Sequence, residues 1–217
     1  MSHKNKYKCI HQIIYLFLVK AVLPLTSRIF VKKVNNPESL DKRAFIVASN
    51  HASLLDPIIL TSVFFLKFNK KLYFIAKEDV FENPLIRLAQ EAWGTIQLYK
   101  KDKGKSALEA AERYLRNGKI IGIFPEGERS YDGKLIKPKT GVARLAISSR
   151  MPVLPVAIKG THKLMARGTI IPKLKKEVAI NIGNFMHFDK YHKKKVSKNQ
   201  YRLITNKIVK NIKVLMK

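Results

Sequence analysis

The chain has 217 residues, a length that fits one domain with a short N-terminal addition and excludes a large multidomain protein. Its 43 Lys and Arg against 15 Asp and Glu give a formal charge of +28, which indicates an anionic partner, while 46% apolar residues exclude a disordered polybasic chain. The single cysteine, Cys9, excludes an intramolecular disulfide and a zinc site built from several cysteines.

The first 35 residues combine a basic start with an apolar stretch. Three lysines among the first eight residues precede a mainly apolar segment at 10–31, which Lys20, Pro24 and Arg28 interrupt. These interruptions disfavour a single span of about 20 apolar residues, and the missing small-residue cleavage site disfavours a secretory signal. We expect residues 1–35 to form a membrane-associated helical hairpin lying in the interface of an anionic bilayer. The alternative is a hairpin buried against its own domain.

Residues 36–217 alternate β-favouring runs with helical patterns. Short apolar runs predict buried strands at 44–49, 72–76, 120–124, 153–158 and 178–182. Helical spacing predicts helices at 56–66, 106–117, 140–149 and 200–216, and the lysine-rich stretch 190–198 predicts a solvated loop. This alternation indicates one α/β domain with a central, mostly parallel sheet flanked by helices.

Two of these helices carry start signals. Asp56 followed by Pro57 is typical of a helix N-terminus with Asp as the cap. Ser106 with Glu109 three residues later predicts a capping box, and Gly118 predicts the end of the same helix.

Residues 50–57 (NHASLLDP) place His51 and Asp56 where a strand ends and a helix begins. If the segment turns so that the Asp56 carboxylate reaches the imidazole, it fixes the His51 tautomer and leaves the other ring nitrogen to accept a proton. The alternative is that Asp56 is only a helix cap and His51 only a turn residue. Because there is no Gly-x-Ser-x-Gly motif and Cys9 lies in the basic N-terminal stretch, a covalent intermediate is not indicated.

Residues 124–130 (FPEGERS) form a second motif directly after a predicted strand. Pro125 and Gly127 favour a tight loop at a strand end, where α/β sheets usually place ligands. Arg129 can bind a phosphate through two N–H groups, and Glu126 can accept from a hydroxyl. A charged surface turn is the alternative.

Two further motifs are weaker. Residues 94–100 (GTIQLYK) form a strand-like run that ends in the cation Lys100. Residues 151–156 (MPVLPV) place two prolines around a strand start, and by themselves are typical of an edge strand.

Taken in this order and spacing, the four motifs resemble the four sequence blocks of the glycerolipid acyltransferases, the family that includes 1-acyl-glycerol-3-phosphate acyltransferase. The resemblance runs from about residue 50 to residue 160. It implies His51 as general base with Asp56 orienting it. It also assigns the phosphate and glycerol of the acceptor to Lys100, Glu126, Gly127 and Arg129, and acyl-CoA or acyl-carrier protein as donor.

Two positions depart from the family pattern. Lys100 stands where the family has Arg, and Lys cannot bind two phosphate oxygens at once. Glu128 stands where a small hydroxyl residue is expected and adds negative charge beside the implied phosphate site. This leaves open an acceptor with a cationic group, such as a lysophospholipid or a lipidated amino acid.

The sequence therefore predicts a membrane-associated O-acyltransferase domain at 36–217, peripheral or monotopic on the cytoplasmic face, that acylates lysophosphatidic acid to phosphatidic acid for phospholipid biosynthesis. No metal or cofactor is expected. The competing interpretation, a non-enzymatic nucleic-acid-binding protein, uses the same charge. It is disfavoured by the apolar N-terminal segment and the missing helix-turn-helix, zinc and aromatic RNA-binding signatures, so we expect no nucleic-acid partner.

Overall fold

The computed structural model of the chain describes residues 3–35, 40, 44–102, 104–169, 171–192 and 195–217. The helices are α1 (His3–Phe17), α2 (Leu23–Phe30), α3 (Leu55–Phe68), α4 (Pro84–Trp93), α5 (Lys105–Arg116), α6 (Gly141–Ser149), α7 (Thr161–Leu164) and α8 (Lys198–Leu215). A π turn, η1 (Leu18–Val22), joins α1 to α2, and short 3-10 turns lie at η2 (Glu78–Phe81), η3 (Lys100–Asp102) and η4 (Asp189–Tyr191).

The described strands form one seven-stranded sheet. They are β1 (Val31–Asn35), β2 (Ile46–Ser49), β3 (Leu72–Lys77), β4 (Ile96–Leu98), β5 (Ile120–Ile123), β6 (Val153–Lys159) and β7 (Val178–Ile182). Their order in the sheet is β1-β7-β6-β2-β5-β3-β4, and every pair is parallel except β6 with β7. The predicted α/β class with a mostly parallel sheet is confirmed.

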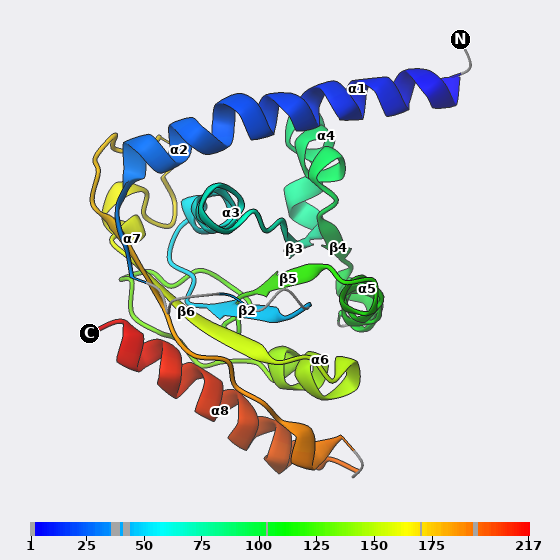
Figure 1. Cartoon of the computed structure of the whole chain (residues 1–217), viewed down its shortest axis with the longest axis vertical. Coiled ribbons are helices and arrows are strands. Elements are labelled where there is room, and N and C mark those ends of the chain that lie inside the picture. Colours follow the sequence, from blue (N-terminus) through cyan, green and yellow to red (C-terminus); the bar gives the residue numbers. More distant parts are fainter. Residues whose placement is uncertain (1–2, 36–39, 41–43, 103, 170, 193–194) are drawn as a thin grey trace.

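Helices cover both faces of this sheet (Figure 1). Alternate residues of β2 point to opposite sides: Val47 packs with α2 and α3, whereas Ile46 and Ala48 pack with α5, α6 and α8. Both faces of the central strands are therefore buried, which is why these strands are continuous apolar runs in the sequence.

The predicted strands and main helices form where expected, with five differences. Three elements were not predicted: β1, α4 and the single-turn helix α7. Helix α4 starts at the cap Asn83, whose side chain accepts the N–H groups of Leu85 and Ile86. The capping box at Ser106 is wrong: α5 begins at Lys105, and Asp102 accepts the backbone N–H groups of Gly104 and Ser106. The strand at 153–158 is not an edge, since β6 lies between β2 and β7.

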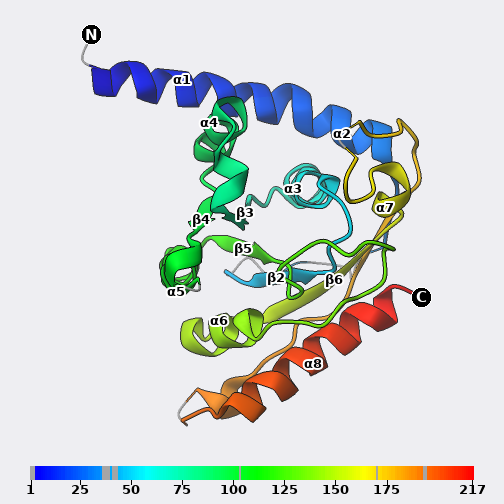
Figure 2. The same ribbon diagram turned by 180° about the vertical axis from the view of Figure 1, so that it is seen from behind.

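The expected N-terminal hairpin is also corrected. The backbone stays right-handed helical through Phe17, Val22 and Leu23, so α1, η1 and α2 form one continuous helix (Figure 2). Pro24 cannot donate a backbone hydrogen bond, and its ring crowds the carbonyl one turn earlier. The π turn absorbs this conflict, since the Leu23 N–H bonds to the Leu18 carbonyl five residues back. The chain therefore passes the proline without folding back.

This N-terminal helix packs lengthwise on the domain. The α1 part contacts α4, and the α2 part contacts α3, where the Ser62 hydroxyl donates to the Leu23 carbonyl at 2.5 Å. The Lys71 ammonium lies over the rings of Tyr15, Tyr73 and Trp93 at 4.4–4.9 Å and joins α1 to the sheet. Burial, together with the charge of Lys119, lowers the pKa of Lys71 to about 8.

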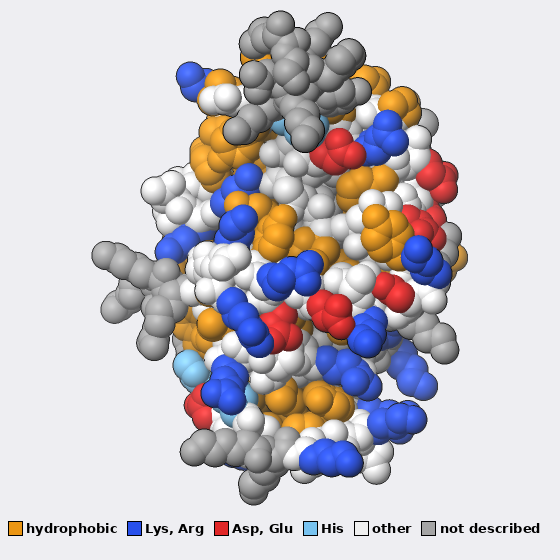
Figure 3. Space-filling view, turned by 90° about the vertical axis from the view of Figure 1, so that its right-hand side faces the viewer, with side chains coloured by type: hydrophobic (Ala, Val, Ile, Leu, Met, Phe, Trp, Pro, Cys, Tyr) orange, Lys and Arg blue, Asp and Glu red, His pale blue; other side chains and the backbone are white. Residues whose placement is uncertain are grey.

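The same helix leaves an apolar side uncovered. Within the described residues, one helix, Cys9–Phe30, is long and apolar enough to cross a membrane. Its exposed side chains include Ile13, Phe17 and Leu25. On the face of the molecule shown in Figure 3, Lys and Arg side chains lie interspersed with acidic and apolar ones, so the positive charge there is spread out.

Candidate active site

The first two motifs meet at one edge of the sheet. His51 follows β2 and residues 124–130 follow β5, and these strands are parallel neighbours with Ile46 beside Ile121. Carboxyl ends of neighbouring parallel strands lie together, which brings both loops side by side. Two hydrogen bonds join them directly, and both involve the His51 backbone. Its N–H donates to Glu126 Oε1 at 2.7 Å, and its carbonyl accepts the Ser130 N–H at 2.9 Å.

His51 and Asp56 form a hydrogen-bonded pair. His51 Nδ1 lies 2.8 Å from Asp56 Oδ2, and the same oxygen accepts the backbone N–H groups of Ala52 and Ser53 at 2.7 Å. Because a carboxylate only accepts, Nδ1 carries the proton and Nε2 is the nitrogen that remains for a substrate. Asp56 is completely buried in the first turn of α3, whereas the His51 side chain is 16% exposed. The turn expected from the spacing is present, although Asp56 lies inside the helix and not at its cap.

One face of the imidazole packs against aromatic rings. The His51 ring stacks on Phe124 with ring centroids 4.0 Å apart and an interplanar angle of 11°, and Phe124 in turn stacks on Phe74. Phe74 leaves little room behind it, since a Cβ at Gly122 would lie 2.4 Å from its ring. The orientation of the imidazole is thus fixed by packing as well as by Asp56.

Glu126 is a buried carboxylate next to the His51 backbone. Its side chain is 1% exposed, and its second oxygen accepts the Ile136 N–H at 2.8 Å. Burial raises the pKa of the Glu126 carboxyl, and the hydrogen bonds from the Ile136 and His51 amides partly offset this rise. The resemblance implied a contact between Glu126 and the acceptor. In the structure each carboxylate oxygen accepts one backbone N–H group, one of them that of His51.

Gly127 and Arg129 continue the same loop. Gly127 has a φ of +71°, and a Cβ there would lie 3.0 Å from Lys139 Cδ, so the position favours glycine both for its backbone angle and for space. The Arg129 side chain is partly buried. Burial and the nearby positive charge of Arg167 lower the pKa of Arg129, and the negative charge of Asp56 opposes this effect.

Arg167 is a site residue that sequence reasoning missed. It lies in the loop after α7, and its Nη1 donates to the Arg129 carbonyl at 2.9 Å. The same nitrogen lies 3.5 Å from Glu128 Oε2, and the guanidinium lies 4.1 Å from the centroid of the Tyr131 ring. The extra negative charge of Glu128 is therefore paired with a cation.

Asn50 and Ser53, also within the first motif, hold it to other parts of the chain. The Asn50 side chain accepts the Ile158 N–H and donates to its carbonyl, both at 2.9 Å, so the end of β2 is fixed to β6. The Ser53 hydroxyl donates to the Met165 carbonyl at 2.8 Å. Both contacts join residues more than 100 positions apart, and the only local sign was the polar character of the two side chains.

The third and fourth motifs have different outcomes. Lys100 lies in η3, and its side chain falls outside the part of the chain that the structure describes. The fourth motif builds the start of β6, where the Pro152 carbonyl accepts the Ile46 N–H at 3.0 Å. It thus pairs with the start of β2, the strand that precedes His51.

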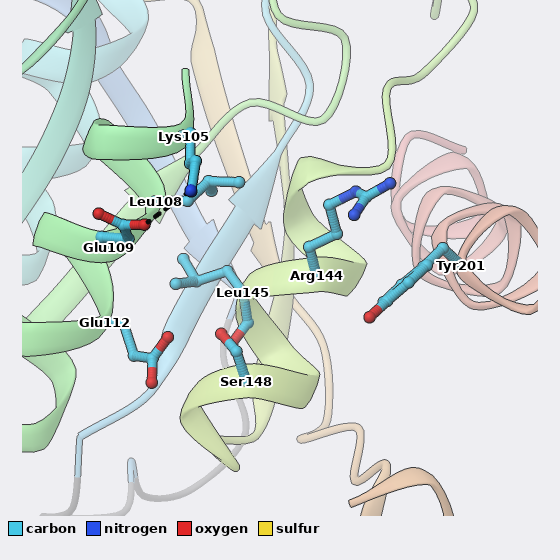
Figure 4. A pocket seen from close by; sticks show the side chains of 8 residues that line it. All are labelled: Lys105, Leu108, Glu109, Glu112, Arg144, Leu145, Ser148 and Tyr201. Carbon is cyan, nitrogen blue, oxygen red and sulfur yellow. Dashed lines mark hydrogen bonds and ion pairs between the residues drawn. The ribbon is translucent and has the colours of Figure 1, made fainter. Parts of the chain in front are cut away.

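A groove of about 230 Å³ lies away from this site, between α5 and α6 beside α8 (Figure 4). Its lining residues are Lys105, Leu108, Glu109, Glu112, Arg144, Leu145, Ser148 and Tyr201. Among the described residues no group of three or more His, Cys, Asp and Glu side chains is placed to hold a metal ion.

The family model of the acyltransferases matches residues 31–159, which include every site residue discussed above except Arg167 and Met165. The chain is 33% identical over 145 residues to the chloroplast 1-acyl-sn-glycerol-3-phosphate acyltransferase of Arabidopsis thaliana, which covers 65% of this chain and 39% of that protein. It is 28% identical over 160 residues to a probable enzyme of the same name from Mycoplasma pneumoniae, covering 72% and 57%. The chain thus spans less than two thirds of the length of these two relatives.

A solved structure resembles the whole fold. The crystal structure of the 1-acyl-sn-glycerophosphate (LPA) acyltransferase PlsC from Thermotoga maritima superposes with a TM-score of 0.66 at 29% identity. The superposition covers 99% of this chain and 83% of the other. The agreement therefore includes the N-terminal helix as well as the α/β domain.

Proposed function

This chain belongs to the acyltransferase family, and we propose that it moves a fatty acyl group from a thioester, acyl-CoA or acyl-carrier protein, to the free hydroxyl of 1-acyl-glycerol-3-phosphate. The product is phosphatidic acid, a precursor in phospholipid biosynthesis. The observation that carries this proposal is the His51–Asp56 pair, which leaves Nε2 of a partly exposed imidazole as proton acceptor. The similarity to 1-acyl-sn-glycerol-3-phosphate acyltransferases supports the choice of acceptor.

In the proposed reaction, His51 Nε2 takes the proton of the acceptor hydroxyl as its oxygen attacks the thioester carbonyl carbon. The new C–O bond forms a tetrahedral intermediate, and its collapse breaks the C–S bond. The imidazolium then returns the proton to the thiolate that leaves. Asp56 stabilises the imidazolium between these steps because it is buried beside Nδ1.

Arg129 is the proposed ligand of the acceptor's phosphate, with Lys100 as a second cation from the third motif. Gly127 is the proposed glycerol-side residue of the same loop, where a side chain would meet Lys139. We assign Glu126 a positioning role, because its carboxylate holds the His51 amide from beneath. The pairing of Glu128 with Arg167 removes the main argument for a cationic acceptor.

Membrane association on the cytoplasmic face, monotopic or peripheral, is the proposed setting of this reaction. The uncovered apolar side of α1 and α2 is one contact with lipid. A second lies in the loop before β7, where Ile171 and Leu174 are 81% and 71% exposed beside Lys173, Lys175 and Lys176. Val31 pairs with Val178, so this loop and the end of α2 meet at one edge of the sheet. Alternating aliphatic and basic side chains suit an anionic bilayer surface.

The test is acyl transfer by purified full-length protein in lipid vesicles, with mass spectrometry of the products. Wild type should convert lysophosphatidic acid to phosphatidic acid, and separate reactions with acyl-CoA and acyl-carrier protein identify the donor. His51→Ala should lose at least a hundredfold in rate, since general base catalysis contributes about 10²–10⁴-fold. His187→Ala, an exposed histidine after β7, is the matched control. Activity of His51→Ala near that of wild type would exclude the proposed base.

A further inference from the structure

We propose that Arg167 is a second phosphate-binding residue of the acceptor site, so that its guanidinium and that of Arg129 bind one phosphate monoester together. This inference rests on the proposed acyltransferase function and extends the acceptor site to Arg167, which lies 38 positions after Arg129 in the chain. Arg167 lies outside the four motifs and beyond the matched family region, which ends at residue 159.

Two contacts, besides the ion pair with Glu128, fix the position of the Arg167 guanidinium. Its Nη1 donates to the backbone carbonyl of Arg129, and its Cζ lies 4.1 Å from the centroid of the Tyr131 ring. The first contact ties Arg167 to the residue that the phosphate is expected to reach. A guanidinium has five N–H donors, so these contacts leave donors for a ligand. The side chain is 29% exposed, which keeps part of it accessible.

The charge balance of this cluster favours an anion. Arg129 and Arg167 are two partly buried cations close enough that the charge of Arg167 lowers the pKa of Arg129. Their exposed counter-ion is Glu128, which lies 3.5 Å from Arg167. Asp56 also attracts Arg129, but it is completely buried and paired with His51, so it is not accessible at the surface of the cluster. One accessible carboxylate thus faces two guanidinium groups, and a phosphate monoester supplies the missing negative charge.

This arrangement also gives Glu128 a role. It holds Arg167 in place before the acceptor binds, and it competes with the phosphate for the same guanidinium. Removing its charge should therefore strengthen acceptor binding as long as Arg167 is present. When Arg167 is absent, Glu128 is an unpaired carboxylate beside the phosphate, and removing its charge should recover part of the lost binding.

The experiment measures kcat and KM for lysophosphatidic acid, and calorimetric binding of glycerol 3-phosphate, with the full chain in detergent micelles. Arg167→Ala should raise KM and weaken glycerol 3-phosphate binding roughly ten- to a hundredfold, because it removes charge-assisted hydrogen bonds, while kcat changes little. Arg167→Lys should recover part of both, Glu128→Gln should lower KM, and Glu128→Gln with Arg167→Ala should bind better than Arg167→Ala alone. Arg202→Ala, an exposed arginine on α8, is the control.

The outcomes separate this inference from the proposed function. If wild type acylates lysophosphatidic acid and Arg167→Ala leaves KM and glycerol 3-phosphate binding unchanged, Arg167 is not a phosphate ligand although the acyltransferase function stands. If Arg167→Ala and Arg167→Lys lower kcat to the same extent and also lower the melting temperature to the same extent, Arg167 has a purely structural role. If wild type binds glycerol 3-phosphate through Arg167 but transfers no acyl group, the anion site stands and the proposed reaction fails.

Discussion

Asp56→Asn separates the geometry of the His51–Asp56 pair from its charge. In the wild type a single oxygen, Oδ2, accepts the hydrogen bonds from His51 Nδ1 and from the amides of Ala52 and Ser53. Within the described part of the chain, Oδ1 is buried without a hydrogen-bond partner. The asparagine can therefore place its amide oxygen at the position of Oδ2 and its amide nitrogen at that of Oδ1. This substitution keeps three hydrogen bonds and the proton on Nδ1.

The variant loses the negative charge beside the imidazolium that forms in the proposed reaction. Two unit charges about 4 Å apart attract each other by about 4 kcal/mol at an effective dielectric constant near 20. Losing this attraction should lower kcat by roughly a hundred- to a thousandfold, since 1.36 kcal/mol is a factor of ten. The free energy of unfolding should fall by about 2 to 4 kcal/mol, because the buried amide nitrogen has no acceptor and the retained bonds lose charge assistance.

The assay compares kcat for phosphatidic acid formation with urea unfolding for each variant. Asp56→Ala should be much less stable than Asp56→Asn, since it leaves two backbone N–H groups and the His51 Nδ1–H without their acceptor. Asp132→Asn, which changes an exposed aspartate that accepts the Lys134 N–H, is the control. The reasoning fails if folded Asp56→Asn keeps kcat within about threefold of wild type, a ratio worth only about 0.6 kcal/mol.

Two further predictions concern the membrane contact and the N-terminal helix. The double variant Ile171→Asp and Leu174→Asp should weaken binding to anionic vesicles at least about tenfold, because it removes two aliphatic contacts and adds charge of the same sign as the lipid. Leu203→Asp, which changes an exposed leucine on α8, is the control. If the double variant sediments with vesicles as strongly as wild type, the loop does not contact the membrane. Burial lowers the pKa of Lys71 to about 8 from 10.5, so between pH 8 and 9.5 the unfolded chain holds more protons at this residue than the folded chain. As the pH rises over that range, the free energy of unfolding of wild type, measured with urea, should therefore increase relative to that of Lys71→Met. If the two free energies change in parallel with pH, Lys71 keeps its ordinary pKa.

The sequence predicted those parts of the fold whose signal is local. The central strands are apolar runs because both of their faces are buried, and their carboxyl ends place the first two motifs together. In contrast, β1 has two lysines among its five residues, and it becomes a strand only because it pairs with β7 about 145 residues later. The start of α4 does have a local signal, since Asn83 followed by Pro84 is typical of a helix N-terminus.

The residues of the candidate site also divide into those that a local pattern predicts and those that only distant contacts bring together. The His51–Asp56 turn lies within six residues, and its hydrogen bond could be predicted from the spacing. The amides that Glu126 holds lie 75 and 10 positions away, so its residue type alone could not show whether it faces the acceptor or the backbone. No local sequence pattern distinguishes Arg167 from a surface arginine, because its contact with Arg129 joins residues that are distant in the chain. The N-terminal hairpin was wrong because a π turn can carry a helix past a proline, which residue patterns do not show.

The two hydrogen bonds that join the His51 backbone to the 126–130 loop have a consequence for folding. Glu126 lies 75 residues from His51, and closing a flexible chain segment of that length costs about 4 kcal/mol by the logarithmic loop rule. The short turn from His51 to Asp56 can form early, since it is local. It cannot orient the imidazole until β2 and β5 pair and bring Phe124 beneath the ring. The orientation of the His51 imidazole therefore forms together with the sheet, and a folding intermediate without that strand pairing contains the His51–Asp56 turn but leaves the imidazole without its packing partner.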